Sequence, residues 1–121
     1  MPLYFIYGPD YPGAVQKRLA ARPAHLTMGA ESGKKGEKVF GRGFLSQEYS
    51  HTEAAPPPSF PSDQANPGMA GSGMIYRFKT LDDAWKRIKA DPYWTEGVWD
   101  KEKMTIVELM EGPNDETMQV V

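Results

Sequence analysis

His25 stands in the segment RPAHL (residues 22–26) and is one of two histidines in the chain. Imidazole is the side chain that changes charge nearest neutral pH, so a positioned histidine can take up and release a proton. Pro23 predicts that a helix begins there. His25 would then lie near unpaired backbone N–H groups that disfavour its charged form. A neutral base is one interpretation, and a histidine that merely hydrogen-bonds a neighbour is the other.

A carboxylate in the segment ADPYWTEGVWD (residues 90–100) is the second candidate for chemistry. Asp91 precedes Pro92, which pushes it out of the helical region and holds it at a rigid turn. Tyr93 and Trp94 follow at once. A carboxylate beside aromatic rings can have a raised pKa or can orient a histidine. The plainer alternative is a turn carboxylate, with the aromatic rings in the core or in a dimer contact.

Small residues form the third segment, AGSG (residues 70–73), where Ser72 offers a hydroxyl and a backbone donor. The chain has no GxSxG, P-loop, HExxH or GxGxxG motif. It also has no cysteine, and its only imidazoles are His25 and His51. These counts exclude a thiolate nucleophile and argue against a closed zinc site. We therefore expect neither a metal nor a cofactor.

Composition limits the class of protein and its partners. A chain of 121 residues with 40% hydrophobic and 25% charged residues is typical of one globular domain. The net charge of −2 gives no large field to attract nucleic acid or an anionic membrane. No apolar run approaches the roughly 20 residues of a membrane span, and the N-terminus lacks a secretory pattern. We expect a cytoplasmic protein with neither kind of partner.

The first half of the chain predicts two strands with helical sequence between them. Residues 3–7 form an apolar, aromatic run that ends at Gly-Pro-Asp, and residues 38–46 alternate apolar and small residues. The helical pattern from Pro12 carries Pro23, which predicts two helical pieces because proline lacks a donor and crowds the preceding turn. The two glycines within residues 38–46 predict room for something close to the backbone.

The second half predicts a long loop, a strand, a helix and a last strand. Residues 47–71 are rich in proline, which indicates either a lid or a disordered insertion. Residues 73–79 alternate as a strand does. Residues 81–90 carry one apolar stripe after a threonine cap, with Lys86, Arg87 and Lys89 facing water. Residues 103–110 are the last strand. A polar tail, residues 113–121, follows a single domain at residues 1–112.

The order βαββαβ predicts an α+β, ferredoxin-like fold, with a four-stranded antiparallel sheet and both helices on one face. Strands 3–7 and 103–110 carry apolar residues on both faces, so the helix-free face needs a cover. A second copy of the sheet, packed face to face about a two-fold axis, would supply it. We expect a homodimer, a dimeric α/β barrel.

These segments, in this order, resemble the YCII-related family. YFIYGPD, which ends in Asp10, RPAHL, AGSG and ADPY match its motifs, and the resemblance covers nearly the whole chain. It implies a dimeric α/β barrel with a cleft that holds the family's histidine and aspartate, which are His25 and Asp91 by motif. The residues it implies for substrate binding are Arg22, Ser72, Tyr93, Asp10 and Trp94.

The resemblance also implies an activity. Where one is assigned in the family, it is similar to a dehydrochlorinase acting on a hydroxylated aromatic, and muconolactone isomerase-like relatives share the barrel. It implies a cofactor-independent lyase or isomerase for a small hydroxylated aromatic or polyketide-like metabolite, with His25 as general base or acid and Asp91 orienting it. A non-catalytic binding or accessory protein using the same cleft is the alternative. The chain departs from the family at GRGFLS, where AGP is usual, which bears on the substrate more than on the fold.

Overall fold

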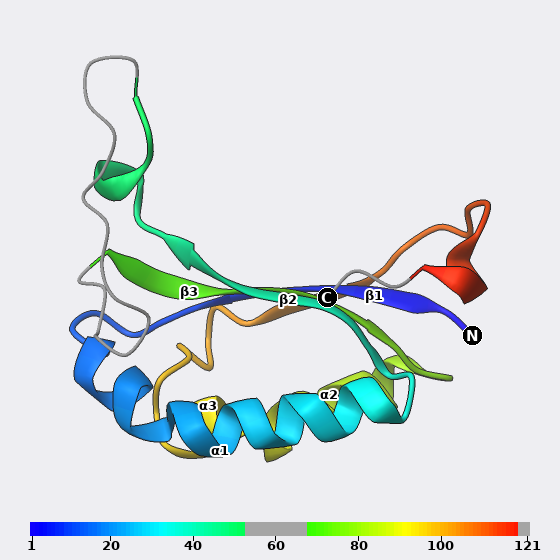
Figure 1. Cartoon of the computed structure of the whole chain (residues 1–121), viewed down its shortest axis with the longest axis horizontal. Coiled ribbons are helices and arrows are strands. Elements are labelled where there is room, and N and C mark those ends of the chain that lie inside the picture. Colours follow the sequence, from blue (N-terminus) through cyan, green and yellow to red (C-terminus); the bar gives the residue numbers. More distant parts are fainter. Residues whose placement is uncertain (53–67, 119–121) are drawn as a thin grey trace.

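Four strands form one sheet in the computed structural model, which describes residues 1–52 and 68–118 (Figure 1). The strands are β1 (Leu3–Pro9), β2 (Lys38–Leu45), β3 (Met69–Arg77) and β4 (Thr105–Glu108). Their order is β2-β3-β1-β4, and every neighbouring pair is antiparallel. This sheet confirms the predicted α+β, ferredoxin-like arrangement.

The helices cover one face of the sheet (Figure 1). They are α1 (Val15–Lys34), α2 (Leu81–Ala90) and the short α3 (Pro92–Thr95). The predicted cap is present, because the Thr80 hydroxyl accepts a 3.1 Å hydrogen bond from the Asp83 N–H. Ala84 and Ile88 of α2 are fully buried against the sheet, as their spacing predicted. No helix in the described ranges combines the length and apolar character that a bilayer crossing requires.

α1 is one continuous helix of 20 residues, so the prediction of two helical pieces divided at Pro23 is wrong. Pro23 is exposed, where water can solvate the backbone that loses its hydrogen bond. Arg18 before it and Ser32 after it are both buried, which holds the two halves on one axis. His25 therefore lies in the helix interior rather than in a first turn. The argument that free N–H groups keep its ring neutral does not apply.

Two strand boundaries differ from their predictions. β3 begins at Met69, so the AGSG segment lies within the strand instead of before it. β4 covers only Thr105–Glu108 of the expected residues 103–110. Of residues 47–71, expected to be either a lid or a disordered insertion, a short 3-10 helix at Gln47–Tyr49 is described, whereas residues 53–67 lie outside the described residues.

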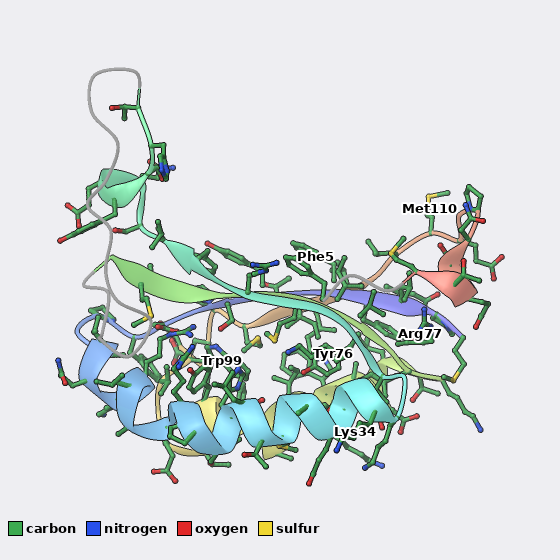
Figure 2. The ribbon with its side chains drawn as sticks, in the orientation of Figure 1. Phe5, Lys34, Tyr76, Arg77, Trp99 and Met110 are labelled. Carbon is green, nitrogen blue, oxygen red and sulfur yellow. The ribbon has the colours of Figure 1, made fainter. Side chains whose placement is uncertain are left out.

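The core fills the layer between the sheet and the helices. Tyr76 and Trp99, both buried, point into this layer, whereas Phe5 lies on the opposite face of the sheet (Figure 2). That opposite face carries an apolar row across all four strands. Strand register places Phe40 beside Ile75, Ile75 beside Phe5, and Phe5 beside Val107. Phe5 is 42% exposed and Val107 46%, whereas Phe40 and Ile75 are half-buried, so the described residues cover this row only in part.

Candidate active site

His25 from α1 and Asp91 from the end of α2 meet in space. Nδ1 of His25 lies 2.7 Å from Oδ1 of Asp91. Asp91 is extended, with ψ 138°, because Pro92 follows it. It is both the C-cap of α2 and the N-cap of α3. The His25 side chain keeps 17% of its surface exposed, whereas that of Asp91 keeps none. The histidine is therefore the member of the pair that a ligand can reach.

Asp91 is held as a carboxylate by three donors. Besides His25, the backbone N–H of Tyr93 donates to Oδ1 at 2.9 Å and Nη1 of Arg87 donates to Oδ2 at 2.9 Å. Burial by itself raises the pKa of Asp91, but the hydrogen bonds from His25, Tyr93 and Arg87 outweigh it and hold the pKa below its ordinary value. The suggested raised pKa is thus contradicted, and Asp91 is a permanent acceptor for His25 at neutral pH.

Arg87 is buried, so the prediction that it faces water is wrong. Its Nε donates to the Ser32 hydroxyl at 2.8 Å and its Nη2 to the Tyr76 hydroxyl at 3.1 Å. Burial raises the pKa of Tyr76 to about 12, so this phenol stays protonated. These contacts fix the guanidinium against Asp91. The spacing of four residues between Arg87 and Asp91 on one helix face was the available sequence signal.

Aromatic rings fix the plane of the imidazole. The His25 ring stacks on the Tyr93 ring at 3.7 Å between centroids with 10° between planes. The Trp99 ring meets His25 edge-on at 6.0 Å. Burial raises the pKa of Tyr93, although Arg18 and Arg22 oppose the rise, so the Tyr93 phenol remains neutral. Ring stacking and the Asp91 contact together leave Nε2 of His25 as the nitrogen not engaged by the carboxylate.

A second buried network surrounds Arg18, which the sequence analysis did not single out. Its Nε donates to Oδ2 of Asp10 at 2.9 Å, and its Nη2 donates to the Ser72 hydroxyl at 2.6 Å. Ser72 also accepts from the Trp99 indole N–H at 3.1 Å. Burial raises the pKa of Asp10 despite the opposing Arg18. Arg18 precedes His25 by seven residues, two helical turns, which was a signal that both lie on one face of α1.

A pocket of about 240 Å³ lies beside His25, between α1 and strands β2 and β3. Four of the residues predicted for the site line it: Arg22, His25, Ser72 and Tyr93. Larger cavities of about 420 and 480 Å³ lie near the chain's N-terminus and between α1 and α3, but His25 lines neither of them. Of these three pockets, it is the one of about 240 Å³ that His25 lines.

The other three predicted residues lie outside the lining of this pocket. Asp91 contacts His25 and Asp10 contacts Arg18, and in each pair the aspartate is not part of the pocket wall. Trp94 instead packs edge-on against Trp85 at 6.3 Å between ring centroids. Within the described ranges, no group of three or more histidine, cysteine, aspartate and glutamate residues is arranged to hold a metal ion.

Residues 2–109 match the family model of the YCII-related domain. The chain belongs to the YCII-related family. Protein YciI of Escherichia coli O6:H1 is 33% identical over 99 residues, which cover 81% of this chain and 88% of that relative. Aspercryptin biosynthesis cluster protein B of Emericella nidulans is 25% identical over 104 residues, 86% of this chain but 60% of that protein. The motifs RPAHL and ADPY thus pointed to the correct family.

A solved structure shares the fold of this YCII-related chain. It is the 5-chloro-2-hydroxyhydroquinone dehydrochlorinase TftG from Burkholderia phenoliruptrix AC1100, in complex with 2,5-dihydroxybenzoquinone. The two structures superpose with a TM-score of 0.68 at 22% identity, over 91% of this chain and 95% of that one. At this identity the likeness establishes the YCII-related fold.

Proposed function

We propose that this protein is a cofactor-independent lyase or isomerase in which His25 moves a proton on a small hydroxylated aromatic or polyketide-like metabolite. One observation carries the proposal: the buried, ionised Asp91 holds Nδ1 of His25 at 2.7 Å, while the same ring borders a pocket. A carboxylate at Nδ1 favours the tautomer with its proton there. Nε2 is then the basic atom available to a substrate.

The proposed reaction begins when Nε2 of His25 takes a proton from a carbon or hydroxyl of the substrate. The imidazolium that forms is stabilised by the adjacent Asp91 carboxylate, which itself stays unprotonated. The electron pair left on the substrate either expels a leaving group, which is an elimination, or is reprotonated by His25 at another atom, which is an isomerisation. Arg87 acts as a positioning residue, because it contacts Asp91 and not the pocket.

The names of two similar proteins support this class of reaction. TftG is a dehydrochlorinase, and its structure holds a hydroxylated quinone. The fungal relative is named for a biosynthesis cluster. An elimination or isomerisation on a hydroxylated ring or a related metabolite agrees with both names and with a site built around one proton-transferring histidine.

The direct test is a turnover assay on the wild-type protein. Chlorinated hydroxyhydroquinones, other hydroxylated aromatics and lactones are incubated with the protein, and products are followed by mass spectrometry and chloride release. We expect product from at least one of these compounds without an added cofactor. If calorimetry detects binding of these compounds but none is converted, the non-catalytic binding or accessory protein is the better assignment.

We also propose that the protein is a homodimer joined through the helix-free face of the sheet. The apolar row of Phe40, Ile75, Phe5 and Val107, of which Phe5 and Val107 are exposed and the other two half-buried, supports this pairing. Tyr7 extends the apolar surface, because it is 45% exposed and stacks on Phe44 at 5.2 Å. An apolar row that one sheet leaves exposed in the monomer is commonly buried against a second sheet in an assembly.

Phe5→Glu is expected to convert the dimer to a monomer, because two carboxylates would be brought together in an apolar interface. Sedimentation equilibrium or light scattering after size exclusion measures the mass. Leu81→Glu is the matched control, since Leu81 is 44% exposed at the start of α2, on the helical side of the sheet. A wild-type monomer, or a Phe5→Glu variant that remains a dimer, would refute the proposed interface.

A further inference from the structure

We propose that the pocket beside His25 is a binding site for a small organic anion. In this inference Lys38 and Arg22 hold a negatively charged oxygen, either a carboxylate or an ionised enol, and His25 faces the carbon skeleton. It rests on the proposed function, because it names the substrate class of the same site. Three observations support this inference: the charges that line the pocket, the position of the Lys38 side chain and the size of the cavity.

Every ionisable group with a fixed charge in the pocket wall is a cation. The wall includes Arg18, Arg22, Lys38 and Arg42, and no aspartate or glutamate of the described ranges is part of it. Asp10 neutralises Arg18. Within residues 1–52 and 68–118, no carboxylate lies at ion-pair distance from Arg22 or Lys38. A hollow with charges of one sign attracts ligands of the other. In a chain of net charge −2, this concentration of cations is not a property of the whole surface.

Lys38 is housed in a space that two glycines leave open. A Cβ atom at Gly41 of β2 would lie 2.7 Å from Cε of Lys38, which is too close for a real contact. A Cβ atom at Gly29 of α1 would lie 3.3 Å from Nζ of Lys38. The side chain therefore runs between strand and helix to the pocket, where it is half-buried. A partly desolvated ammonium without a carboxylate is stabilised when an anion binds.

The rest of the wall suits a compact carbon skeleton. Leu26, Met74 and the two tyrosines, Tyr76 and Tyr93, supply apolar surface. The volume of about 240 Å³ is below the roughly 300–1,000 Å³ of pockets that hold drug-sized ligands, so a single-ring compound fits better than a larger one. Such a ligand would place its skeleton on these side chains and its charged oxygen against the cations.

The test compares matched ligands by isothermal titration calorimetry. One pair is 2,5-dihydroxybenzoate and its neutral methyl ester, and 2,5-dihydroxybenzoquinone serves as the ionised enol. We expect the wild-type protein to bind the carboxylate or the ionised enol at least about tenfold more tightly than the ester. Whichever of the two anions binds more tightly shows whether the site prefers a carboxylate or an ionised enol. Equal affinity for all three ligands would overturn the inference.

Lys38→Met removes the charge and keeps a flexible stem over Gly41. We expect the variant to bind the preferred anion about 10-fold to 100-fold more weakly, with little change for the ester. Lys34→Met is the control, because Lys34 is exposed at the C-terminal end of α1 and loses the same charge (Figure 2). Equal weakening of anion and ester by Lys38→Met would contradict a charge-selective role.

Two further measurements keep the result interpretable. If Lys38→Met does not fold, raising the salt concentration on the wild-type protein should shrink the preference for the anion, and a preference independent of salt would contradict the inference. Turnover of the same ligands is measured alongside binding, because binding of an anion does not need proton transfer. If the protein prefers anions but converts none of the compounds, the anion site stands and the proposed function is refuted. If it converts a compound but shows no preference for anions, the proposed function stands and the anion site is refuted.

Discussion

His25→Gln is expected to lower kcat/KM for a substrate that the wild type converts by about 10²-fold to 10⁴-fold, the range typical of a positioned general acid or base. Glutamine can still hydrogen-bond to Asp91, which accepts from Nδ1 of His25 at 2.7 Å. It has no basic atom to take a proton. Steady-state kinetics across the pH range measures the loss, with circular dichroism to show that the variant is folded.

His51→Gln is the matched control for this experiment. His51 is exposed and does not line the pocket beside His25, so its replacement should leave kinetics unchanged. If His25→Gln turns over substrate as fast as the wild type, the imidazole has no part in the mechanism. If both variants lose activity equally, the effect is not specific to the site.

Asp91→Asn is expected to reduce the free energy of unfolding by about 3–5 kcal/mol at neutral pH, since it leaves the buried Arg87 without its carboxylate. That loss is a large fraction of the roughly 5–15 kcal/mol by which domains are stable. The pKa of Asp91 is lower in the folded protein than in the unfolded chain. Its contribution is therefore fully present above the unfolded pKa of about 3.9 and is lost as the pH falls through the lower folded value.

Urea unfolding of wild type and Asp91→Asn between pH 7 and pH 3 tests both the size and the sign of this effect. The difference between the two proteins should be largest near pH 7 and should close as the solution becomes more acidic than about pH 4. Asp82→Asn is the control, because Asp82 is exposed in the first turn of α2. A difference that stays constant with pH, or grows in acid, would show that Asp91 is not the stabilising carboxylate described above.

The fold could be predicted from the sequence because its signals are local. The strand at Leu3–Pro9 follows from a short apolar run, the strand at Lys38–Leu45 from alternation, and the cap at Thr80 from capping chemistry, all within a few residues. Pro23 misled the prediction, since its preference is local whereas the packing of α1 on the sheet is not. The pairing of His25 with Asp91 was anticipated only through family motifs, because no local rule joins residues that lie 66 positions apart.

The buried arginines show what one sequence does not reveal. Arg87 falls on the polar side of a helical pattern, yet contacts with Ser32, Tyr76 and Asp91 draw its guanidinium inside. Long side chains bury their stems and place their heads where tertiary structure supplies partners. The glycines of β2 did indicate free space, but only the approach of α1 to that strand shows that Lys38 occupies it.

The proposed proton-transferring pair and one of the two proposed anion-binding cations are carried by different elements. Arg22 and His25 lie on α1 and Asp91 caps α2 and α3, whereas Lys38 and Gly41 belong to β2. Residues along that strand can therefore be exchanged without moving the imidazole or its carboxylate. GRGFLS (residues 41–46), which departs from the family pattern and includes the end of β2, lies where we expect a change to alter the choice of compound and to leave the proposed acid-base chemistry intact. Protein engineering could therefore change which compound the pocket binds through substitutions in β2, while His25 and Asp91 stay as they are.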